Sequence, residues 1–187
     1  QGYVDLLIPI CKSVGSDLGF RVCETAIQVY GGYGYSREYP VEQFLRDCKI
    51  ASIYEGTNGI QALDLVGRKL TLKRGQLVKN ALAAINEILA KFRTNFNLRD
   101  MVQIYDEAQE SLIQVTKFFA LKGMTDEFHV PLLYAKPYLD LCGDVSMGFL
   151  LLWQAHLADR RLREIYRDHN ASDDVSRGKV LRENRSA

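Results

Sequence analysis

Apolar residues recur every three or four positions along almost the whole chain, a spacing that places them on one face of an α-helix. The first such pattern runs from Val4 to about Tyr30 and predicts a helix. Pro9 and Gly15 lie inside it, and a proline there can bend a helix or delay its start. The apolar stripe of this helix comprises Leu7, Ile10, Val14, Leu18, Val22, Ala26 and Val29.

A cluster of glycines ends this helix: Gly31, Gly32 and Gly34. Tyr39 and Pro40 follow, and this pair favours an extended residue before a fresh helix start. The second helix is predicted to end at Gly56, with an apolar face of Phe44, Leu45, Cys48, Ile50 and Ala51. Thr57 or Asn58 can then cap a third helix, whose buried side is predicted to use Ile60, Leu63 and either Val66 or Gly67.

Three longer helical patterns follow Gly75. The first two are amphipathic, one through Leu77, Ala81, Ile85, Ile88 and Phe92, the other through Met101, Ile104 or Tyr105, Ala108, Leu112, Val115 and Phe119. Gly123 is predicted to end the second of these helices, and Pro131 and Pro137 to limit a shorter segment. A long helix from Leu139 to Ile165 comes last, with one side formed by Cys142, Val145, Phe149, Leu152 and His156.

These patterns predict an all-α protein in which an antiparallel helical bundle is followed by a second helical bundle or hairpin region. Residues 1–75 are expected to form the first unit and residues 76–167 the second. Residues 168–187 are polar and charged, with too few apolar positions to build a core, so a flexible tail is expected there.

Composition and charge exclude several function classes. The 187 residues carry a formal net charge of only +1, without the basic surface that nucleic-acid binding requires. The four cysteines show neither the CxxC spacing nor the histidine partners of a zinc site, and free thiols in a reducing compartment are expected. Neither a transmembrane segment nor a signal peptide is recognisable. The chain starts inside a helical pattern, which suggests a fragment of a longer protein.

The candidate chemistry centres on residues 53–59, with the sequence Ile-Tyr-Glu-Gly-Thr-Asn-Gly. Taken alone, Glu55 near a helix C-terminus is most often a solvated surface group. The same position disfavours its charged form, a property that suits a general base near neutral pH. Gly56 can be a plain helix C-cap or allow close approach of a ligand, and Thr57 and Asn58 can be an N-cap and nothing more.

Three further motifs accompany this stretch: Gln28 through Tyr35 with its glycines, Tyr39-Pro40-Val41-Glu42, and Arg46-Asp47. The glycine cluster lacks a preceding strand and the spacing of a dinucleotide fingerprint. Together these motifs resemble the C-terminal helical domain of the flavin-dependent acyl-CoA dehydrogenases. The resemblance extends from the N-terminus to about Gly75.

The resemblance implies a role for each motif residue. Glu55 would abstract the α-proton of an acyl-CoA thioester while the β-hydride passes to FAD, which yields the 2,3-enoyl-CoA. The backbone N–H of Glu55 would help to polarise the thioester carbonyl. Tyr54 and Gly56 would contact the substrate. The residues expected to bind FAD are Gln28, Gly31, Gly32, Thr57, Asn58 and Gly59.

The family also implies partners. Gln28 through Gly32 usually contact the FAD of a neighbouring subunit, so a homodimer or homotetramer is expected, with electrons leaving to an electron-transfer flavoprotein. From about Gln76 onward the chain resembles the extra C-terminal domain of a larger bacterial subgroup that includes 3-methylmercaptopropionyl-CoA dehydrogenase. A cytoplasmic bacterial enzyme is expected. The fragment alone should be inactive, because the upstream domains supply most of the flavin site.

Two other functions are compatible with parts of the pattern. A non-catalytic helical oligomerisation or docking module need not retain Glu55 together with Gln28, Gly31 and Gly32, so their joint presence favours the enzyme. A related flavoenzyme such as a nitroalkane oxidase uses an aspartate as its base, and Glu55 argues against that chemistry.

Overall fold

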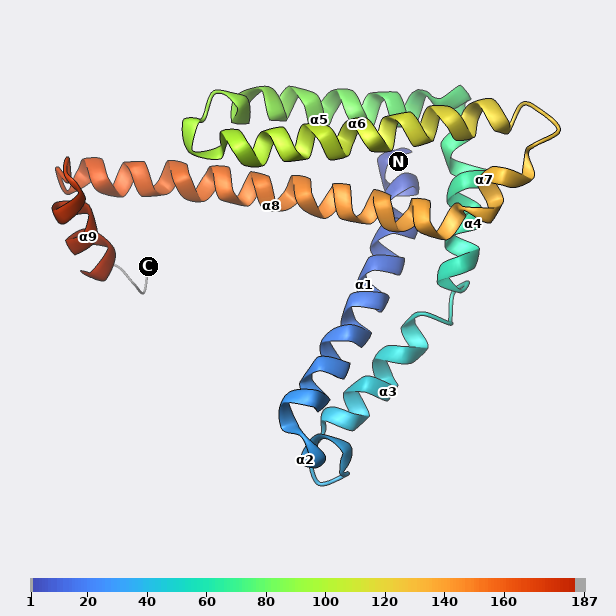
Figure 1. Ribbon diagram of the computed structural model, residues 1–187, viewed down its shortest axis with the longest axis horizontal. Coiled ribbons are helices and arrows are strands. Elements are labelled where there is room, and N and C mark those ends of the chain that lie inside the picture. The colour runs from blue at the N-terminus through green and yellow to red at the C-terminus, as the bar shows by residue number, and fades with distance from the viewer. Residues whose placement is uncertain (1, 184–187) are drawn as a thin grey trace.

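The computed structural model describes residues 2–183, and every element in that range is a helix (Figure 1). The all-α prediction is confirmed. The α-helices are α1 (Gly2–Tyr30), α2 (Gly32–Tyr35), α3 (Val41–Ala51), α4 (Asn58–Gly67), α5 (Gln76–Arg93), α6 (Arg99–Lys122), α7 (His129–Leu133), α8 (Ala135–Asp168) and α9 (Asp174–Glu183). Two short 3₁₀ helices, η1 (Lys69–Gly75) and η2 (Phe96–Leu98), join α4 to α5 and α5 to α6.

The helices form an arm and a bundle. In the arm, α1 and α3 lie side by side and are joined at the tip by α2; in the bundle, α5, α6 and α8 run along one another (Figure 1). The first part of α8 also packs against α1 and α4, which connects the arm to the bundle. At this crossing the helices approach closely, since a Cβ atom on Gly143 would lie 2.5 Å from Cγ2 of Val14.

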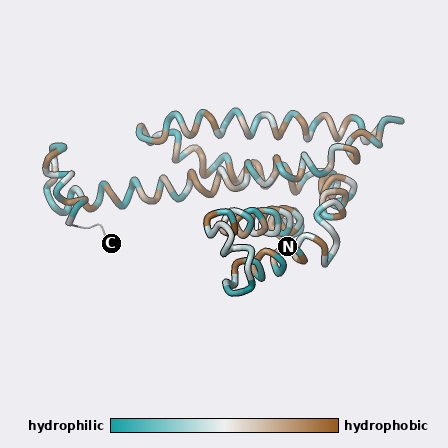
Figure 2. Tube along the Cα trace, turned by 60° about the horizontal axis from the view of Figure 1, so that its bottom comes forward, coloured by the Kyte–Doolittle hydropathy of each residue, from teal (hydrophilic) through white to brown (hydrophobic). Residues whose placement is uncertain are grey.

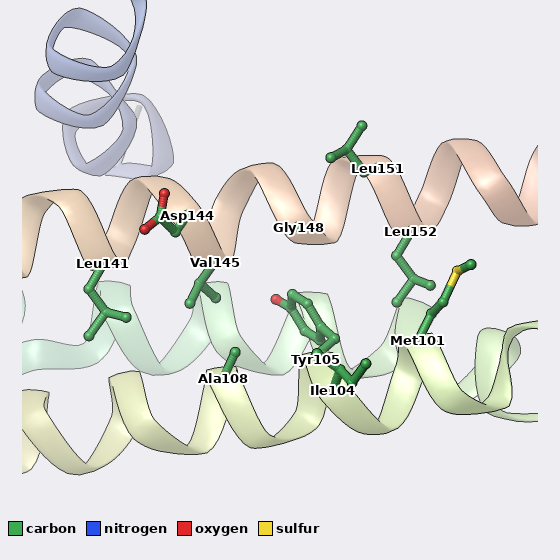
Figure 3. A pocket seen from close by; sticks show the side chains of 10 residues that line it. All are labelled: Met101, Ile104, Tyr105, Ala108, Leu141, Asp144, Val145, Gly148, Leu151 and Leu152. Atoms are coloured by element: carbon green, nitrogen blue, oxygen red, sulfur yellow. The ribbon is translucent and has the colours of Figure 1, made fainter. Parts of the chain in front are cut away.

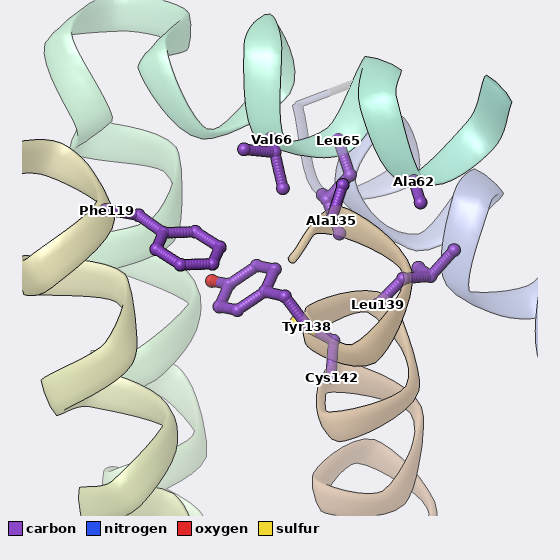
Figure 4. Close-up of a cluster of buried hydrophobic side chains, with 8 residues drawn as sticks. All are labelled: Ala62, Leu65, Val66, Phe119, Ala135, Tyr138, Leu139 and Cys142. Atoms are coloured by element: carbon purple, nitrogen blue, oxygen red, sulfur yellow. The ribbon is translucent and has the colours of Figure 1, made fainter. Parts of the chain in front are cut away.

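One buried cluster joins α4, α6 and the start of α8 (Figure 4), and it comprises Ala62, Leu65, Val66, Phe119, Ala135, Tyr138, Leu139 and Cys142. The Tyr138 hydroxyl and the Thr116 hydroxyl share a hydrogen bond of 2.7 Å. Burial raises the pKa of the Cys142 thiol to about 12. The cluster contains residues from both sides of Gly75, so the structure does not show two separate units. The predicted division of the chain into residues 1–75 and 76–167 therefore remains a prediction.

The second cluster lies between α5, α6 and α8 and comprises Leu89, Phe92, Leu98, Val102, Tyr105, Val145, Phe149 and Leu152. Phe92, Tyr105, Val145, Phe149 and Leu152 belong to the apolar faces predicted for these helices, whereas the predicted Met101 and Ile104 are exposed. Hydrophobic and hydrophilic positions alternate along the trace of these helices (Figure 2). A polar contact closes one end of the bundle. Asp159 of α8 accepts hydrogen bonds from the side chains of Asn95 and Asn97, each 2.7 Å long, and pairs with Arg163 at 2.8 Å.

Several boundaries differ from the predictions. The second helix ends at Ala51, not Gly56, because the chain leaves the helix in a turn whose Tyr54 N–H still donates to the Ile50 carbonyl. Pro137 lies inside the first turn of α8, where a proline costs no hydrogen bond. Residues 174–183, expected in the flexible tail, form α9; the rest of that prediction, residues 184–187, lies outside the described residues.

The faces of two helices also differ. α4 buries Asn58, Ala62, Leu65 and Val66, whereas Ile60 and Leu63 are 55% and 41% exposed. The predicted face is therefore right at Val66 and wrong at Ile60 and Leu63, because α8 and α1 cover the side of α4 that carries Ala62 and Leu65. α1 likewise buries Leu6, Pro9, Ser13 and Ser16, while most of its apolar stripe faces outward.

Candidate functional site

Glu55 lies in an exposed turn between α3 and α4, and its backbone is left-handed. Glu55 has φ of 55° and Gly56 has φ of 80°. For a residue with a side chain this conformation costs about 1–2 kcal/mol, and such residues concentrate at functional sites. Glycine adopts the same conformation freely, which explains Gly56.

Contacts with α4 hold this turn in place. The side-chain amide of Gln61 donates a 2.9 Å hydrogen bond to the Glu55 carbonyl, and the Asn58 N–H donates to the Ser52 carbonyl at 3.2 Å. Among the described residues, no acceptor is found for the Glu55 backbone N–H. The turn therefore presents a carboxylate and a free N–H from one residue.

Thr57, and not the alternative Asn58, is the N-cap of α4. Its hydroxyl oxygen accepts a hydrogen bond from the Ile60 N–H at 3.2 Å. The Asn58 N–H is taken up by Ser52, which leaves the exposed Gly59 as the residue whose N–H has no acceptor in the described part of the chain. The start of α4 thus combines a positive helix end with one available donor.

The Asn58 side chain points into the protein and is only 7% exposed. Its carbonyl oxygen accepts from the Lys12 ammonium at 2.7 Å, and its amide donates to Ser16 at 2.9 Å and to Asp17 at 2.8 Å. Asp17 in turn pairs with Lys136 of α8 at 3.1 Å. Asn58 therefore ties the start of α4 to α1 and, through Asp17, to α8.

The glycine cluster lies at the tip of the arm (Figure 1). Gly31 has φ of 60° and its N–H donates to the Gln28 carbonyl at 3.2 Å, which ends α1. Gly31 and Gly32 are exposed, and a Cβ atom on either would meet nothing within 4 Å. Gly34 is different, since its Cβ would lie 2.6 Å from the Ile27 carbonyl oxygen. The first two glycines leave open space for a ligand, and the third is required by packing.

The predicted site residues therefore fall into two groups. Residues 54–59 gather at one end of α3, and Gln28, Gly31 and Gly32 lie at its other end (Figure 1). Tyr54 is 51% exposed beside Glu55. One chain does not bring the two groups together.

Sequence reasoning missed the residues that position the turn. Gln61 carries no motif of its own, and its role depends on the left-handed backbone at Glu55. Lys12, Ser16 and Asp17 did leave a signal: they are polar positions spaced along one face of a largely apolar helix.

A groove between α6 and α8 lies apart from both groups (Figure 3). It has a volume of about 320 Å³ and is lined almost entirely by apolar side chains, including Met101, Ile104 and Leu151, with Asp144 at its edge. Among the described residues, no cluster of histidine, cysteine, aspartate or glutamate side chains is arranged to hold a metal ion, and no helix is long and apolar enough to cross a membrane.

Two family models match the chain. Residues 2–71 match the model described as "Acyl-CoA dehydrogenase, C-terminal domain", and residues 77–181 match the one described as "Acetyl-CoA dehydrogenase C-terminal like". The chain belongs to the acyl-CoA dehydrogenase family. Members of this family are oxidoreductases and flavoproteins of fatty acid metabolism that generally use FAD.

Curated relatives of the chain are acyl-CoA enzymes of bacteria. A butyryl-CoA dehydrogenase of Syntrophomonas wolfei subsp. wolfei is 35% identical over 86% of this chain and 26% of its own length. A 3-methylmercaptopropionyl-CoA dehydrogenase of Ruegeria pomeroyi is 38% identical over 42% of this chain and 13% of its own length. A subunit of the caffeyl-CoA reductase–Etf complex of Acetobacterium woodii is 41% identical over 33% of this chain and 16% of its own length. The chain thus spans about a quarter or less of these relatives.

Proposed function

We propose that this chain supplies the catalytic base of an FAD-dependent acyl-CoA dehydrogenase. In the full-length protein, the Glu55 carboxylate removes the α-proton of an acyl-CoA thioester, and the product is the 2,3-enoyl-CoA. The observation that carries this proposal is the left-handed Glu55–Gly56 turn, which exposes both the carboxylate and the backbone N–H of Glu55.

The two exposed groups of Glu55 have complementary tasks. Removal of the α-proton leaves negative charge that spreads to the thioester oxygen, and a fixed N–H donor at that oxygen stabilises it. The Gln61 hydrogen bond to the Glu55 carbonyl fixes the same peptide segment from the other side. Gly56 has no side chain to obstruct the acyl group, and the exposed Tyr54 ring can form a wall of the acyl pocket.

The residues predicted to bind FAD are compatible with that cofactor. When bound, FAD accepts the two electrons that leave the acyl group. Gly31 and Gly32 offer open space at the arm tip, and the start of α4 offers the Gly59 N–H beside the Thr57 cap. Asn58 contributes through the position of its backbone, since its side chain is bound to α1. Because these groups lie at opposite ends of α3, they fit FAD molecules of two subunits in a homodimer or homotetramer.

The relatives suggest the partners. Their names include butyryl-CoA and 3-methylmercaptopropionyl-CoA, which favours an acyl-CoA thioester as the substrate. One relative is named as a subunit of an Etf complex, which favours an electron-transfer flavoprotein as the electron acceptor. The bacterial relatives and the absence of a membrane-spanning helix among the described residues are compatible with a cytoplasmic enzyme.

The test uses the purified full-length protein with its flavin. The protein is titrated anaerobically with a panel of acyl-CoA thioesters, and the flavin absorbance is followed for the wild type and for Glu55→Gln. The variant keeps the backbone N–H and loses the base, so we expect it to bind acyl-CoA without bleaching the flavin, whereas the wild type bleaches.

Glu87→Gln is the matched control, because Glu87 is an exposed glutamate on α5, outside the predicted site. It should bleach as the wild type does. A flavin-free wild-type protein, or bleaching that survives Glu55→Gln, would contradict the proposal and favour a docking module or a different chemistry.

A further inference from the structure

Two cysteines face each other across the arm. Cys23 of α1 and Cys48 of α3 have their sulfur atoms 3.5 Å apart, and either thiol can donate a hydrogen bond to the other. Both residues are partly buried. A Cβ atom on Gly19 would lie 3.8 Å from the Cys48 sulfur, so that sulfur rests in a notch formed by positions 19 and 23, one helical turn apart on α1.

We propose that Cys23 and Cys48 are a site of reversible oxidation, at which a low-molecular-weight disulfide converts the thiol pair into a disulfide that links α1 to α3. The sulfur atoms must approach from 3.5 Å to about 2.05 Å, the length of a disulfide bond. This assignment is independent of the proposed dehydrogenase activity.

The chemistry balances as a thiol–disulfide exchange. One protein thiolate attacks a sulfur of the small disulfide, forms a mixed disulfide and releases one small thiolate. The second protein thiol loses its proton, attacks the protein sulfur of the mixed disulfide and releases the other half. Two protein thiols are oxidised, and one small disulfide is reduced to two thiols.

The surroundings favour this pair over the other cysteines. The hydrogen bond with Cys48, together with burial and the Cys48 charge, raises the pKa of the Cys23 thiol, which lowers its fraction of thiolate. Exchange needs only one thiolate at a time. Cys142 is buried, and Cys11 is exposed without a sulfur neighbour among the described residues. Cys11 can therefore form a mixed disulfide but not an internal link.

The link would have a structural consequence at the arm tip. Cys23 precedes, and Cys48 follows, the turn that carries Gln28, Gly31 and Gly32. A disulfide would thus close the arm covalently below this turn. Cytosolic disulfides are usually transient and serve redox sensing. The Cys23–Cys48 site would thus form its disulfide when small disulfides accumulate and return to two thiols when they are reduced.

The test treats the full-length flavoprotein with glutathione disulfide, blocks the remaining thiols with N-ethylmaleimide and digests it with trypsin without reduction. Trypsin places Cys23 in residues 22–37 and Cys48 in residues 47–49. We expect a linked pair of these peptides that dithiothreitol separates, and loss of both thiols from the alkylated pool. In Cys48→Ser the link should be absent, and Cys23 should instead retain glutathione.

Cys11 reports whether the oxidant reaches the protein, and the flavin spectrum reports whether the protein stays folded. The proposal is wrong if Cys11 carries glutathione while Cys23 and Cys48 each carry N-ethylmaleimide, because both thiols then remained reduced. It is equally wrong if the linked peptide appears only after the protein has been unfolded in urea.

Discussion

The helices of the bundle bury their apolar stripes against one another, whereas α1 of the arm turns much of its stripe outward. In the bundle, Leu89 and Phe92 are 0% and 2% exposed. In the arm, Val22 and Val29 are 66% and 79% exposed. Both regions have helical patterns of the same kind in the sequence, so the difference comes from what each helix packs against.

This difference indicates that α1 leaves more of its predicted stripe without a packing partner in the described chain than α5 does. A contiguous outward apolar face on a soluble helix marks an interaction surface. The chain spans 26% of the length of the butyryl-CoA dehydrogenase that it matches. We infer that the outward apolar face of α1 is an interaction surface.

The largest expected effect contrasts Phe92 with Val29 in the 187-residue chain. Phe92→Ala removes a ring that is 2% exposed and stacks with Phe149 at a centroid distance of 6.4 Å, and we expect a loss of about 3–5 kcal/mol in the free energy of unfolding. Val29→Ala, at an exposed helical position, should change it by less than about 0.5 kcal/mol. Urea denaturation measures both. Equal losses would mean that the arm buries its stripe within the chain.

A smaller effect is expected where the arm is held by polar groups. Asn58→Ala removes the partner of Lys12, Ser16 and Asp17 at a buried position, and we expect a loss of about 1–3 kcal/mol in the free energy of unfolding. Asn80→Ala is the matched control, since Asn80 is exposed and, among the described residues, its side chain hydrogen-bonds to Gln76 of its own helix. If both variants unfold at the same urea concentration, the buried network does not anchor α4.

The sequence predicted the bundle well because its helices pack on one another. The periodicity of α5, α6 and α8 identified Phe92, Tyr105 and Phe149, which are buried as predicted, whereas Met101 and Ile104 of the predicted α6 face are exposed. Periodicity failed for α4, since a helix with apolar residues on two sides can be buried on either. The helices α8 and α1 pack on the side of α4 that carries Ala62, where the small side chain permits close packing.

The sequence motif placed the candidate residues next to one another, but it did not predict the shape of their turn. The motif gave Glu55, Gly56 and Thr57, and the Thr57 cap follows from its hydroxyl. Periodicity extended the helix to Gly56, because no local signal reports that a glutamate adopts a left-handed backbone. That conformation depends on Gln61 and on the Asn58 contact with Ser52, both of which require α4 to be in place.

The smallest expected effect tests whether strain in the arm serves catalysis. Glu55→Gly replaces a left-handed residue by one that adopts this conformation freely, so we expect a gain of up to about 1 kcal/mol in the free energy of unfolding. In the full-length flavoprotein the same variant should lose acyl-CoA-dependent bleaching, since the base is gone. Stability and activity would then change in opposite directions, as at sites that store strain for function.

Arg74→Gly is the matched control for this prediction. Arg74 has φ of 58°, close to the 55° of Glu55, and lies in η1, outside the predicted site. Arg74→Gly should give a similar gain in the free energy of unfolding and leave bleaching unchanged, because the two substitutions relieve the same backbone strain and only one removes the base. If Glu55→Gly destabilises the protein while Arg74→Gly stabilises it, the Glu55 side chain itself supports the fold, and its left-handed backbone is not strain held for catalysis.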